Sequence, residues 1–278
     1  MATIGRTNLM LAVRETPSGL YLDGGDLGEI LLPGRLIPRG VRAGDKVEAF
    51  VHHDSEDRLV ATTERPRAEV GGFAAMRVKD IHDRAGAFLD WGLSKDLLLP
   101  FREQSPKVRV GDTPVVAVTI DEDSGRVIAS MRVSRFLDKN PHDLRDGDEV
   151  RLLVLEETPL GYAAIVDGRW RGLLYRTDLA GPLEIGLETR GFVRRVREDG
   201  KLALALDEAG YGRVAPLGER IMEELAKAGG RLNYDDSSDP EAIRARFGAS
   251  KKAFKQALGA LYRARRIAFT SPGIEAVR

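Results

Sequence analysis

Residues 86–112 read GAFLDWGLSKDLLLPFREQSPKVRVGD, and the pattern of this stretch occurs three times along the chain. A pair of glycines 25 positions apart marks each copy: Gly19 and Gly44, Gly86 and Gly111, Gly161 and Gly186. The first copy agrees closely, since residues 19–45 read GLYLDGGDLGEILLPGRLIPRGVRAGD. The third copy, residues 161–187, agrees less well. A repeat of this period predicts a tandem array of one structural unit.

Each unit has the pattern of short strands. In the second copy the alternating or β-branched segments, punctuated by Gly, Pro, Asp and Ser, predict strands at 75–82, 86–91, 96–100, 112–121 and 126–132. Five strands in about sixty residues is the size of an OB-type barrel, whose closure hides the sheet edges. The first glycine of each pair is expected where a strand bends sharply and a side chain would be strained. Turn formation and a ligand-related role explain it equally well.

The last quarter of the chain changes to a helical period. Leu217, Ile221 and Leu225 predict a helix that ends at 229–230, where two glycines follow Lys227. A capping Asp239 before Pro240 predicts a second helix, and Ser250 caps a third one. Residues 265–269 and 274–277, separated by a Ser-Pro-Gly turn, predict a hairpin. Helices followed by a hairpin in this order form a winged helix.

These patterns define the fold class and the domain organisation. We expect a mainly β protein with a small α+β C-terminal domain: three tandem five-stranded barrels of the OB type followed by a winged helix. The expected boundaries are 1–66, 67–141 and 142–212 for the barrels and 213–278 for the winged helix.

Composition and charge restrict the function classes. The 43 Lys and Arg residues balance 43 Asp and Glu residues, so no global positive field attracts a polyanion, and only residues 213–278 are distinctly basic, with 13 basic and 8 acidic residues. The chain has no cysteine, which excludes disulfides and thiolate metal sites. Polar residues interrupt the apolar run at the N-terminus, so we expect no signal peptide, no membrane span and a cytoplasmic location.

An enzymatic function has little support in the sequence. The four histidines, His52, His53, His82 and His142, lack the spacing of metal ligands. No phosphate loop or nucleophile elbow is present, and the acidic clusters at 54–57 and 121–123 fall at predicted turns. We therefore expect no catalytic residue, no metal and no cofactor.

Two segments resemble a known RNA-binding domain. The acidic turn and strand at 121–130, DEDSGRVIAS, resemble the closing half of an S1 domain, and residues 172–179, GLLYRTDL, resemble the S1 segment Gly-Leu-hydrophobic-His-x-Ser-Glu-Leu. With the winged helix, nearly the whole chain resembles the bacterial conserved virulence factor B family, which has S1 repeats and a C-terminal winged helix. The S1 histidine is replaced by Pro33, Pro100 and Tyr175 in the three copies. The resemblance implies binding to RNA.

Candidate contacts follow from the chemistry of single strands, whose bases stack on aromatic rings while basic side chains hold the phosphates. The candidates in the barrels are Phe88, Trp91, Lys95, Tyr162, Arg169, Trp170, Tyr175, Arg176 and Arg194, with Arg195 and Arg197 on the same strand as Arg194. We expect Trp170, between two arginines, to be exposed, whereas Phe88 fits the core and the surface equally well. In the first copy Tyr21 stands at the place of Phe88, and acidic residues surround it, so that copy is expected to be structural.

The third helix of the winged-helix domain adds Lys251, Lys252 and Lys255, which suit contact with phosphates. A solvated basic face or a partner-docking face explains them as well. The resulting hypothesis is a protein that binds single-stranded RNA, with DNA as a second possible ligand, and regulates gene expression after transcription. The alternatives are a DNA-binding transcriptional regulator and an adaptor that docks on the translation or RNA-decay machinery. The sequence names no protein partner.

Overall fold

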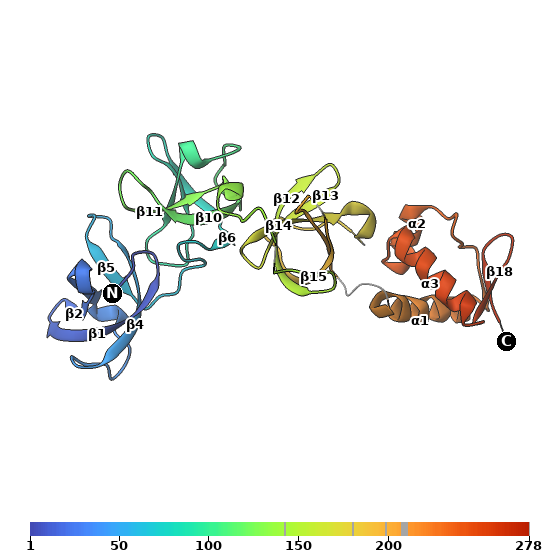
Figure 1. The fold of residues 1–278 in the computed structure, drawn as a ribbon, viewed down its shortest axis with the longest axis horizontal. Coiled ribbons are helices and arrows are strands. Elements are labelled where there is room, and N and C mark those ends of the chain that lie inside the picture. Colours follow the sequence, from blue (N-terminus) through green and yellow to red (C-terminus); the bar gives the residue numbers. More distant parts are fainter. Residues whose placement is uncertain (142, 180, 198, 207–210, 278) are drawn as a thin grey trace. The chain divides into compact units, whose positions relative to one another are not determined.

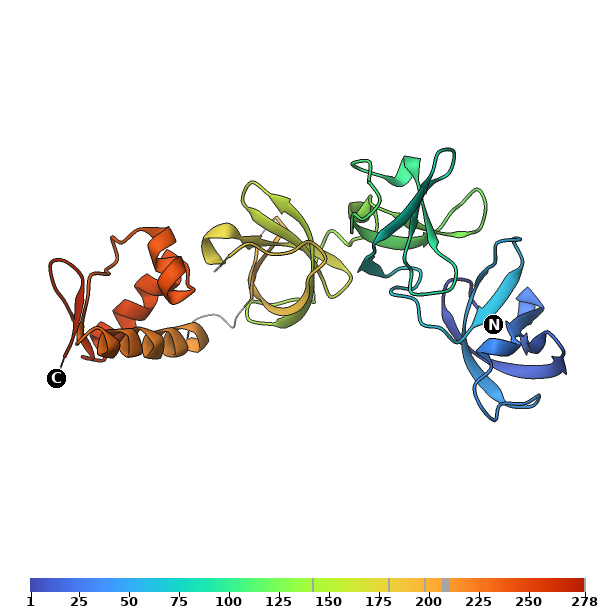
Figure 2. The ribbon, with the colours of Figure 1, turned by 180° about the vertical axis from the view of Figure 1, so that it is seen from behind.

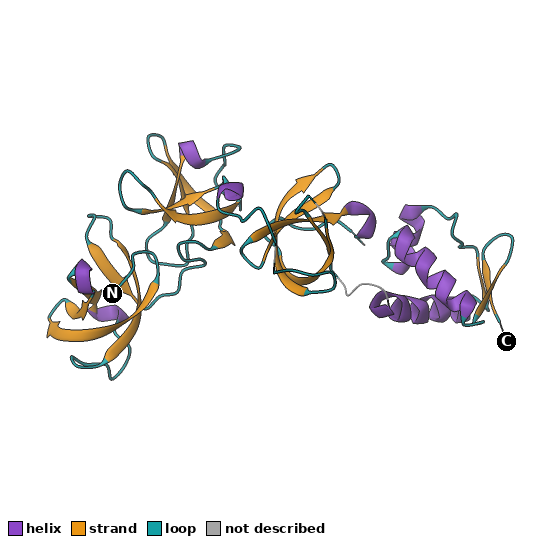
Figure 3. Cartoon of the chain, in the orientation of Figure 1, coloured by secondary structure: helices purple, strands orange, loops and turns teal. Residues whose placement is uncertain are grey.

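The computed structural model describes residues 1–141, 143–179, 181–197, 199–206 and 211–277 (Figure 1). Position 142, where we expect the third barrel to begin and where His142 stands, lies outside the described residues. The chain divides into two compact units, Met1–Phe136 and Leu137–Arg278. Strands dominate up to residue 205, and the α-helices all follow (Figure 3).

The first five strands close into a barrel in the order β1-β2-β3-β5-β4. Its strands are β1 (Thr7–Thr16), β2 (Gly19–Asp23), β3 (Glu29–Pro33), β4 (Lys46–His53) and β5 (Leu59–Thr62). Neighbouring strands are antiparallel except β3 and β5, which are parallel. Alternation places Leu20 and Leu22 of β2 and Ile30 and Leu32 of β3 in the core, each at most 1% exposed.

The second module keeps this strand order, but its first strand is divided into two shorter strands, β6 and β7. Its strands are β6 (Phe73–Ala75), β7 (Val78–His82), β8 (Gly86–Leu89), β9 (Leu97–Pro100), β10 (Val115–Ile120) and β11 (Val127–Ser130). They pair as two three-stranded sheets, β7-β8-β9 and β11-β10-β6. Hydrogen bonds continue across the break, because the Met76 and Val78 N–H groups donate to the Pro114 and Asp112 carbonyls at 3.1 and 2.8 Å. The single strand predicted at 75–82 is therefore β6 and β7 together.

The third module is again a closed barrel, visible as a ring in Figure 2. Its strands are β12 (Glu149–Thr158), β13 (Gly161–Val166), β14 (Trp170–Tyr175), β15 (Glu188–Val196) and β16 (Leu202–Ala205). Their order, β12-β13-β14-β16-β15, repeats that of the first barrel, and β14 and β16 are the parallel pair. The three repeats of the sequence thus correspond to three copies of one strand arrangement.

The repeated glycines explain why the sequence pattern recurs. Gly19, Gly86 and Gly161 have φ of +145°, +141° and +149°. An added Cβ would lie 2.0 to 2.2 Å from a carbonyl oxygen of the following strand, for example 2.0 Å from that of Leu174 at Gly161. The close approach of two backbones therefore requires glycine, and this structural need explains why glycine stands at all three positions.

The second glycine of each pair has a different structural role. Gly44, Gly111 and Gly186 have φ of +99°, +95° and +87°, and an added Cβ at Gly44 or Gly111 would meet nothing within 4 Å. Their N–H groups donate to the carbonyls of Ala12, Val78 and Val154 at 2.7 to 2.9 Å. The positive φ of these glycines forms the turn in which their N–H groups can donate to these strand carbonyls.

The C-terminal elements form the predicted winged helix. They are α1 (Tyr211–Lys227), β17 (Arg231–Leu232), α2 (Pro240–Phe247), α3 (Lys251–Arg263), β18 (Ile267–Phe269) and β19 (Ile274–Ala276). The caps are as expected: Asp239 accepts from the N–H groups of Glu241 and Ala242, and Ser250 accepts from that of Ala253. The short β17, which pairs with β19, was not predicted. None of the helices in the described part of the chain combines the length and the apolar character needed to cross a membrane.

An aromatic contact joins the first two modules within the unit Met1–Phe136. The Trp91 ring is 2% exposed and meets Phe50 of β4 edge to face, with ring centroids 5.3 Å apart. Its Nε1–H donates to the Ala68 carbonyl at 2.8 Å. The prediction that Trp91 contacts nucleic acid is therefore wrong, because neither face of the ring is open.

Lys95 belongs to the same junction. Its Nζ donates to the carbonyl oxygens of His53 and Asp54 at 2.7 and 2.8 Å, and burial lowers its pKa. It holds the second module against the first, which contradicts its predicted contact with phosphate. The neighbouring His52 is 6% exposed, and burial lowers the pKa of its imidazole.

Replacing Gly161 by alanine tests the close approach of the backbones. We expect Gly161→Ala to lower the free energy of unfolding of Leu137–Arg278 by about 3 kcal/mol or more, since backbone strain and a clash with the Leu174 carbonyl add up. Gly147→Ala is the matched control, because Gly147 also has a positive φ, +98°, but an added Cβ there would meet nothing within 4 Å. It should cost only about 1 kcal/mol, the penalty of the left-handed backbone. Urea unfolding followed by the fluorescence of Trp170 measures both. Equal losses would contradict the explanation.

The buried His52 predicts a pH dependence of the unit Met1–Phe136. Because its pKa is lowered in the folded state, the unfolded state binds the proton more readily, and stability falls as the pH drops below about 6.5. Between pH 7.5 and 5.5 the loss due to His52 is at most about 1.4 kcal/mol. Urea midpoints of His52→Leu should change less over this range than those of the wild type, whereas those of the exposed control His82→Leu should change as much. A His52→Leu variant with the full pH dependence would refute this.

Candidate nucleic-acid interface

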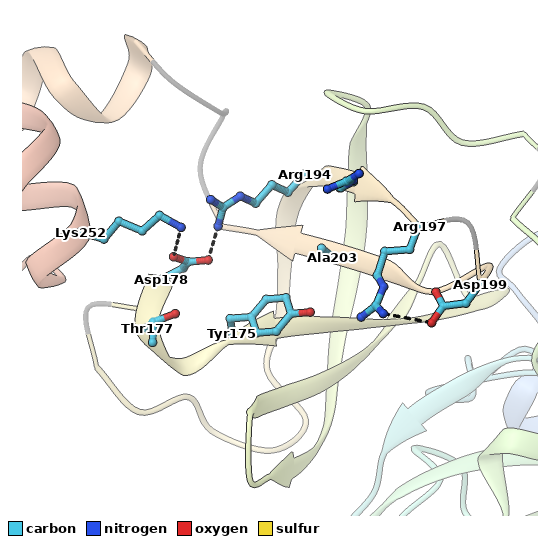
Figure 4. A pocket seen from close by; sticks show the side chains of 9 residues that line it. Tyr175, Thr177, Asp178, Arg194, Arg197, Asp199, Ala203 and Lys252 are labelled. Atoms are coloured by element: carbon cyan, nitrogen blue, oxygen red, sulfur yellow. Dashed lines mark hydrogen bonds and ion pairs between the residues drawn. The ribbon is translucent and has the colours of Figure 1, made fainter.

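A groove of about 800 Å³ opens on the third barrel beside the end of β14 (Figure 4). The short 3-10 turn Arg176–Asp178 that follows β14 forms one side, and the end of β15 forms another. Four cationic side chains and two carboxylates line it: Arg194, Arg195, Arg197, Lys252, Asp178 and Asp199. The charge of this lining is therefore positive, which suits an anionic ligand.

A β-bulge explains why two consecutive arginines reach one groove. In the register of β15 with β16, Val193 pairs with Leu204 and Arg195 pairs with Ala203, so Arg194 is an extra residue on β15. A bulge of this kind bends the strand and changes the direction of the side chains that follow. Val193 stays in the core, while Arg194 and Arg195 both line the groove.

Asp178 is the anionic centre of the groove. Its side chain is only 7% exposed, and it accepts a hydrogen bond from the Arg194 guanidinium. Lys252 of α3, in the same compact unit, places its Nζ 3.3 Å from Asp178 Oδ1. Two cations share this one carboxylate, so part of their charge remains available to a ligand.

The other side of the groove has a similar excess of cations. Arg197 and Lys201 both place a nitrogen 3.2 Å from Asp199 Oδ2. Arg195 is exposed, and among the described residues its guanidinium has no ion-pair or hydrogen-bond partner. Arg195 is thus the cation of the groove that is most available to a phosphate.

Tyr175 is the aromatic ring of the groove. It is the last residue of β14, pairs with Gly161 of the neighbouring strand β13, and is partly exposed. Figure 4 shows its ring between the turn that carries Asp178 and the side chain of Arg197. A partly exposed ring next to guanidinium groups is what stacking of a base and contact with its phosphate require.

Two other predicted aromatic residues are not available. Tyr162 and Trp170 are 4% and 6% exposed and belong to the barrel core, so the expectation that Trp170 is exposed is wrong. The alternation of β14 directs Trp170, Gly172 and Leu174 inward, whereas the arginine at 171 points out. In the part of the chain that the structure describes, the buried Trp170 Nε1–H has no acceptor.

The arginines predicted beside these rings have other partners. Arg169 binds Asp138 at 2.6 Å and Asp143 at 3.1 Å, and its guanidinium lies 4.7 Å from the centre of the Trp170 ring. Arg176 pairs with Glu157 of β12 at 2.9 Å. Both fasten neighbouring segments of the barrel and lie outside the lining of the groove, unlike Arg194.

In the second module Phe88 is on the outer face. Ala87 and Leu89 on either side of it are fully buried, so alternation along β8 directs Phe88 away from the core, where it is partly exposed. Its role in binding stays a prediction.

The three lysines of α3 are all engaged, although mostly exposed. Lys251 donates to the Ser237 carbonyl at 3.1 Å, Lys255 lies 3.1 Å from Asp236, and Lys252 binds Asp178. The pair of Lys255 with Asp236 is exposed on both sides, so it is weak and can exchange for a phosphate. Within the described ranges no group of three His, Asp or Glu side chains could hold a metal ion.

Sequence reasoning missed the carboxylate that organises the groove. Asp178 occupies the place at which the S1 segment carries glutamate, so the alignment of residues 172–179 contained the only signal for it. Its pairing with Lys252, 74 positions away, had no signal in the sequence.

Comparison with known proteins assigns the two ends of the chain to domain families. Residues 219–275 match the CvfB-like winged helix domain, and residues 4–64 match the S1 domain. Both are domain types that point to nucleic-acid binding rather than to catalysis.

Other proteins are similar to this chain along most of its length. The uncharacterized protein YitL of Bacillus subtilis is 29% identical over 89% of this chain and 85% of its own length. Conserved virulence factor B of Staphylococcus saprophyticus is 26% identical over 80% of this chain and 77% of its own length, and that of Staphylococcus aureus over 80% and 76%. A crystal structure of a multidomain protein with nucleic acid binding domains from Streptococcus pneumoniae aligns over 99% of this chain and 98% of its own, with 22% identity and a TM-score of 0.43. The chain is therefore similar to conserved virulence factor B proteins along most of its length, and its C-terminal domain matches the CvfB-like winged helix domain.

Proposed function

We propose that this protein binds single-stranded RNA through the groove of the third barrel and the lysines of α3. The observation that carries the proposal is the position of Tyr175 beside Arg195 and Arg197 in one positively charged groove. We further propose that the protein acts in the cytoplasm, on gene expression after transcription, and that its domains divide as 1–66, 67–141, 142–212 and 213–278.

The chemistry of the groove suits an unpaired strand better than a duplex. One base can stack on the Tyr175 ring while Arg195 binds a neighbouring phosphate, and stacking on an aromatic residue contributes about 1–3 kcal/mol per base. A duplex hides its base faces, so it could use only the cations. On α3, Gln256 is the main side chain suited to reading base edges, which gives little support to sequence-specific recognition of DNA.

The junction between the first two modules suggests a division of labour. The Trp91 ring and Lys95 hold these modules together instead of facing a ligand. The principal ligand surface then lies in the unit Leu137–Arg278, while Phe88 on the outer face of β8 offers a weaker contact. Several weak contacts on one chain increase the total affinity through effective concentration.

Removing the ring or the unpaired arginine should weaken binding in different ways. Tyr175→Leu should raise the Kd for a fluorescein-labelled single-stranded RNA by about fivefold to a hundredfold, the cost of one stacked base. Arg195→Gln should raise the Kd and, in addition, reduce the slope of log K against log salt concentration by about 0.7, because one phosphate contact is lost. Fluorescence anisotropy at two or more salt concentrations measures both effects.

Arg190→Gln provides the matched control. Arg190 is an exposed arginine of the same strand that pairs with Glu149, outside the groove. Its loss should leave the Kd and the salt dependence nearly unchanged. Affinity that is indifferent to salt, or equal effects of Arg190→Gln and Arg195→Gln, would contradict the proposed site, and tighter binding to duplex DNA would favour a DNA-binding regulator.

A further inference from the structure

The winged-helix domain exposes a pair of aromatic rings that its fold does not use. Tyr262 of α3 is 54% exposed and Phe269 of β18 is 46% exposed. Their ring centroids lie 5.3 Å apart with an interplanar angle of 49°. Each ring therefore contacts the other and still offers much of its surface to solvent.

The core of the domain closes beneath this pair. Leu258 and Leu261 of α3, Ile267 of β18 and Ile274 of β19 are at most 5% exposed. Phe269 pairs with Ile274 at the end of the hairpin next to the turn. It follows the buried Ile267 by two positions, so both side chains lie on the same face of the hairpin. The two exposed rings thus lie at the rim of a core that is already filled.

The chain between the two rings carries an arginine in an unusual conformation. Arg265 has a φ of +56°, the left-handed conformation that glycine usually supplies at the end of a helix. Its N–H donates to the Tyr262 carbonyl at 2.9 Å, which fixes the backbone of the turn that follows Tyr262. Its guanidinium is exposed and has no ion-pair or hydrogen-bond partner among the residues that the structure describes. A strained arginine with a free charge suggests a role outside the domain.

A glycine in the middle of α3 leaves space beside Tyr262. Gly259 precedes Tyr262 by three positions and follows Lys255 by four, so all three lie on one face of the helix. An added Cβ at Gly259 would meet nothing within 4 Å, so packing does not require glycine here. Glycine weakens a helix relative to alanine. The Gly259 carbonyl accepts a hydrogen bond from the Arg263 Nε–H at 3.2 Å, so the side chain that the structure places on this backbone is a cation.

We propose that Tyr262 and Phe269 form a second stacking site, which takes an unpaired nucleotide of the strand bound by the third barrel. Arg265 binds a phosphate of that nucleotide, and the absence of a side chain at Gly259 allows its sugar-phosphate backbone to approach. This inference rests on the proposed function and extends the ligand surface to residues outside the groove.

The charges around the rings favour a polyanion over an apolar peptide. Arg263 follows Tyr262 directly, Arg265 stands in the segment between the two rings, and Lys255 lies two turns before Tyr262 on the same face of α3. The acidic residue of the hairpin, Glu275, pairs with Ala268 and so points to the opposite face from Phe269.

The test uses the full chain and a fluorescein-labelled oligoadenylate, whose bases stack well. Tyr262→Leu and Phe269→Leu keep an apolar side chain but remove the ring, and each should raise the Kd by about fivefold or more. Tyr262→Phe keeps the ring and is the matched control, with the affinity of the wild type. Thermal unfolding of each variant confirms that the domain is folded.

Gly259→Ala separates binding from folding. Alanine should leave the domain as stable as the wild type or more stable, because it favours the helix, and yet it should weaken binding by crowding the ring. If the wild type binds the oligonucleotide while both leucine variants and Gly259→Ala bind it equally well, the second site is refuted and the groove of the third barrel stands. If the wild type does not bind at all, the proposed function fails as well.

Discussion

The contact between two backbones at Gly161 is the constraint on which the barrels depend. Only a residue without Cβ allows β13 to pass so close to the Leu174 carbonyl, and the same contact recurs at Gly19 and Gly86. In the third barrel it also positions one wall of the groove beside β14, because the residue paired with Gly161 is Tyr175. The closure of the sheet and the placement of the aromatic ring therefore have one physical cause.

The three modules share one scaffold but differ at one position of it. The position opposite the constrained glycine holds Pro33, Pro100 or Tyr175, so only the third copy places an aromatic ring there. The first two copies instead bury Trp91 against Phe50 and form one compact unit. The balanced net charge of the chain fits this division, since cations gather at a groove instead of covering the surface.

The sequence predicted the backbone well and the accessibility of side chains poorly. Glycine spacing and helix caps are local signals with fixed geometric meaning, so they revealed the modules and the helices. Strand alternation sorts side chains into two faces without saying which face is the core, and this misplaced Trp170 and left Phe88 undecided. Trp91 and Lys95 were misjudged because Phe50, which packs on Trp91, and the carbonyls of His53 and Asp54, which bind Lys95, belong to another module.

Crosslinking of the full chain to a single-stranded RNA that contains 4-thiouridine, followed by mapping of the crosslinked peptides, tests the placement of the ligand most directly. We expect crosslinks in residues 170–178 and 188–197, at Tyr175 and the end of β15. Crosslinks confined to residues 1–136, with bound RNA and none in the third barrel, would contradict the proposed surface.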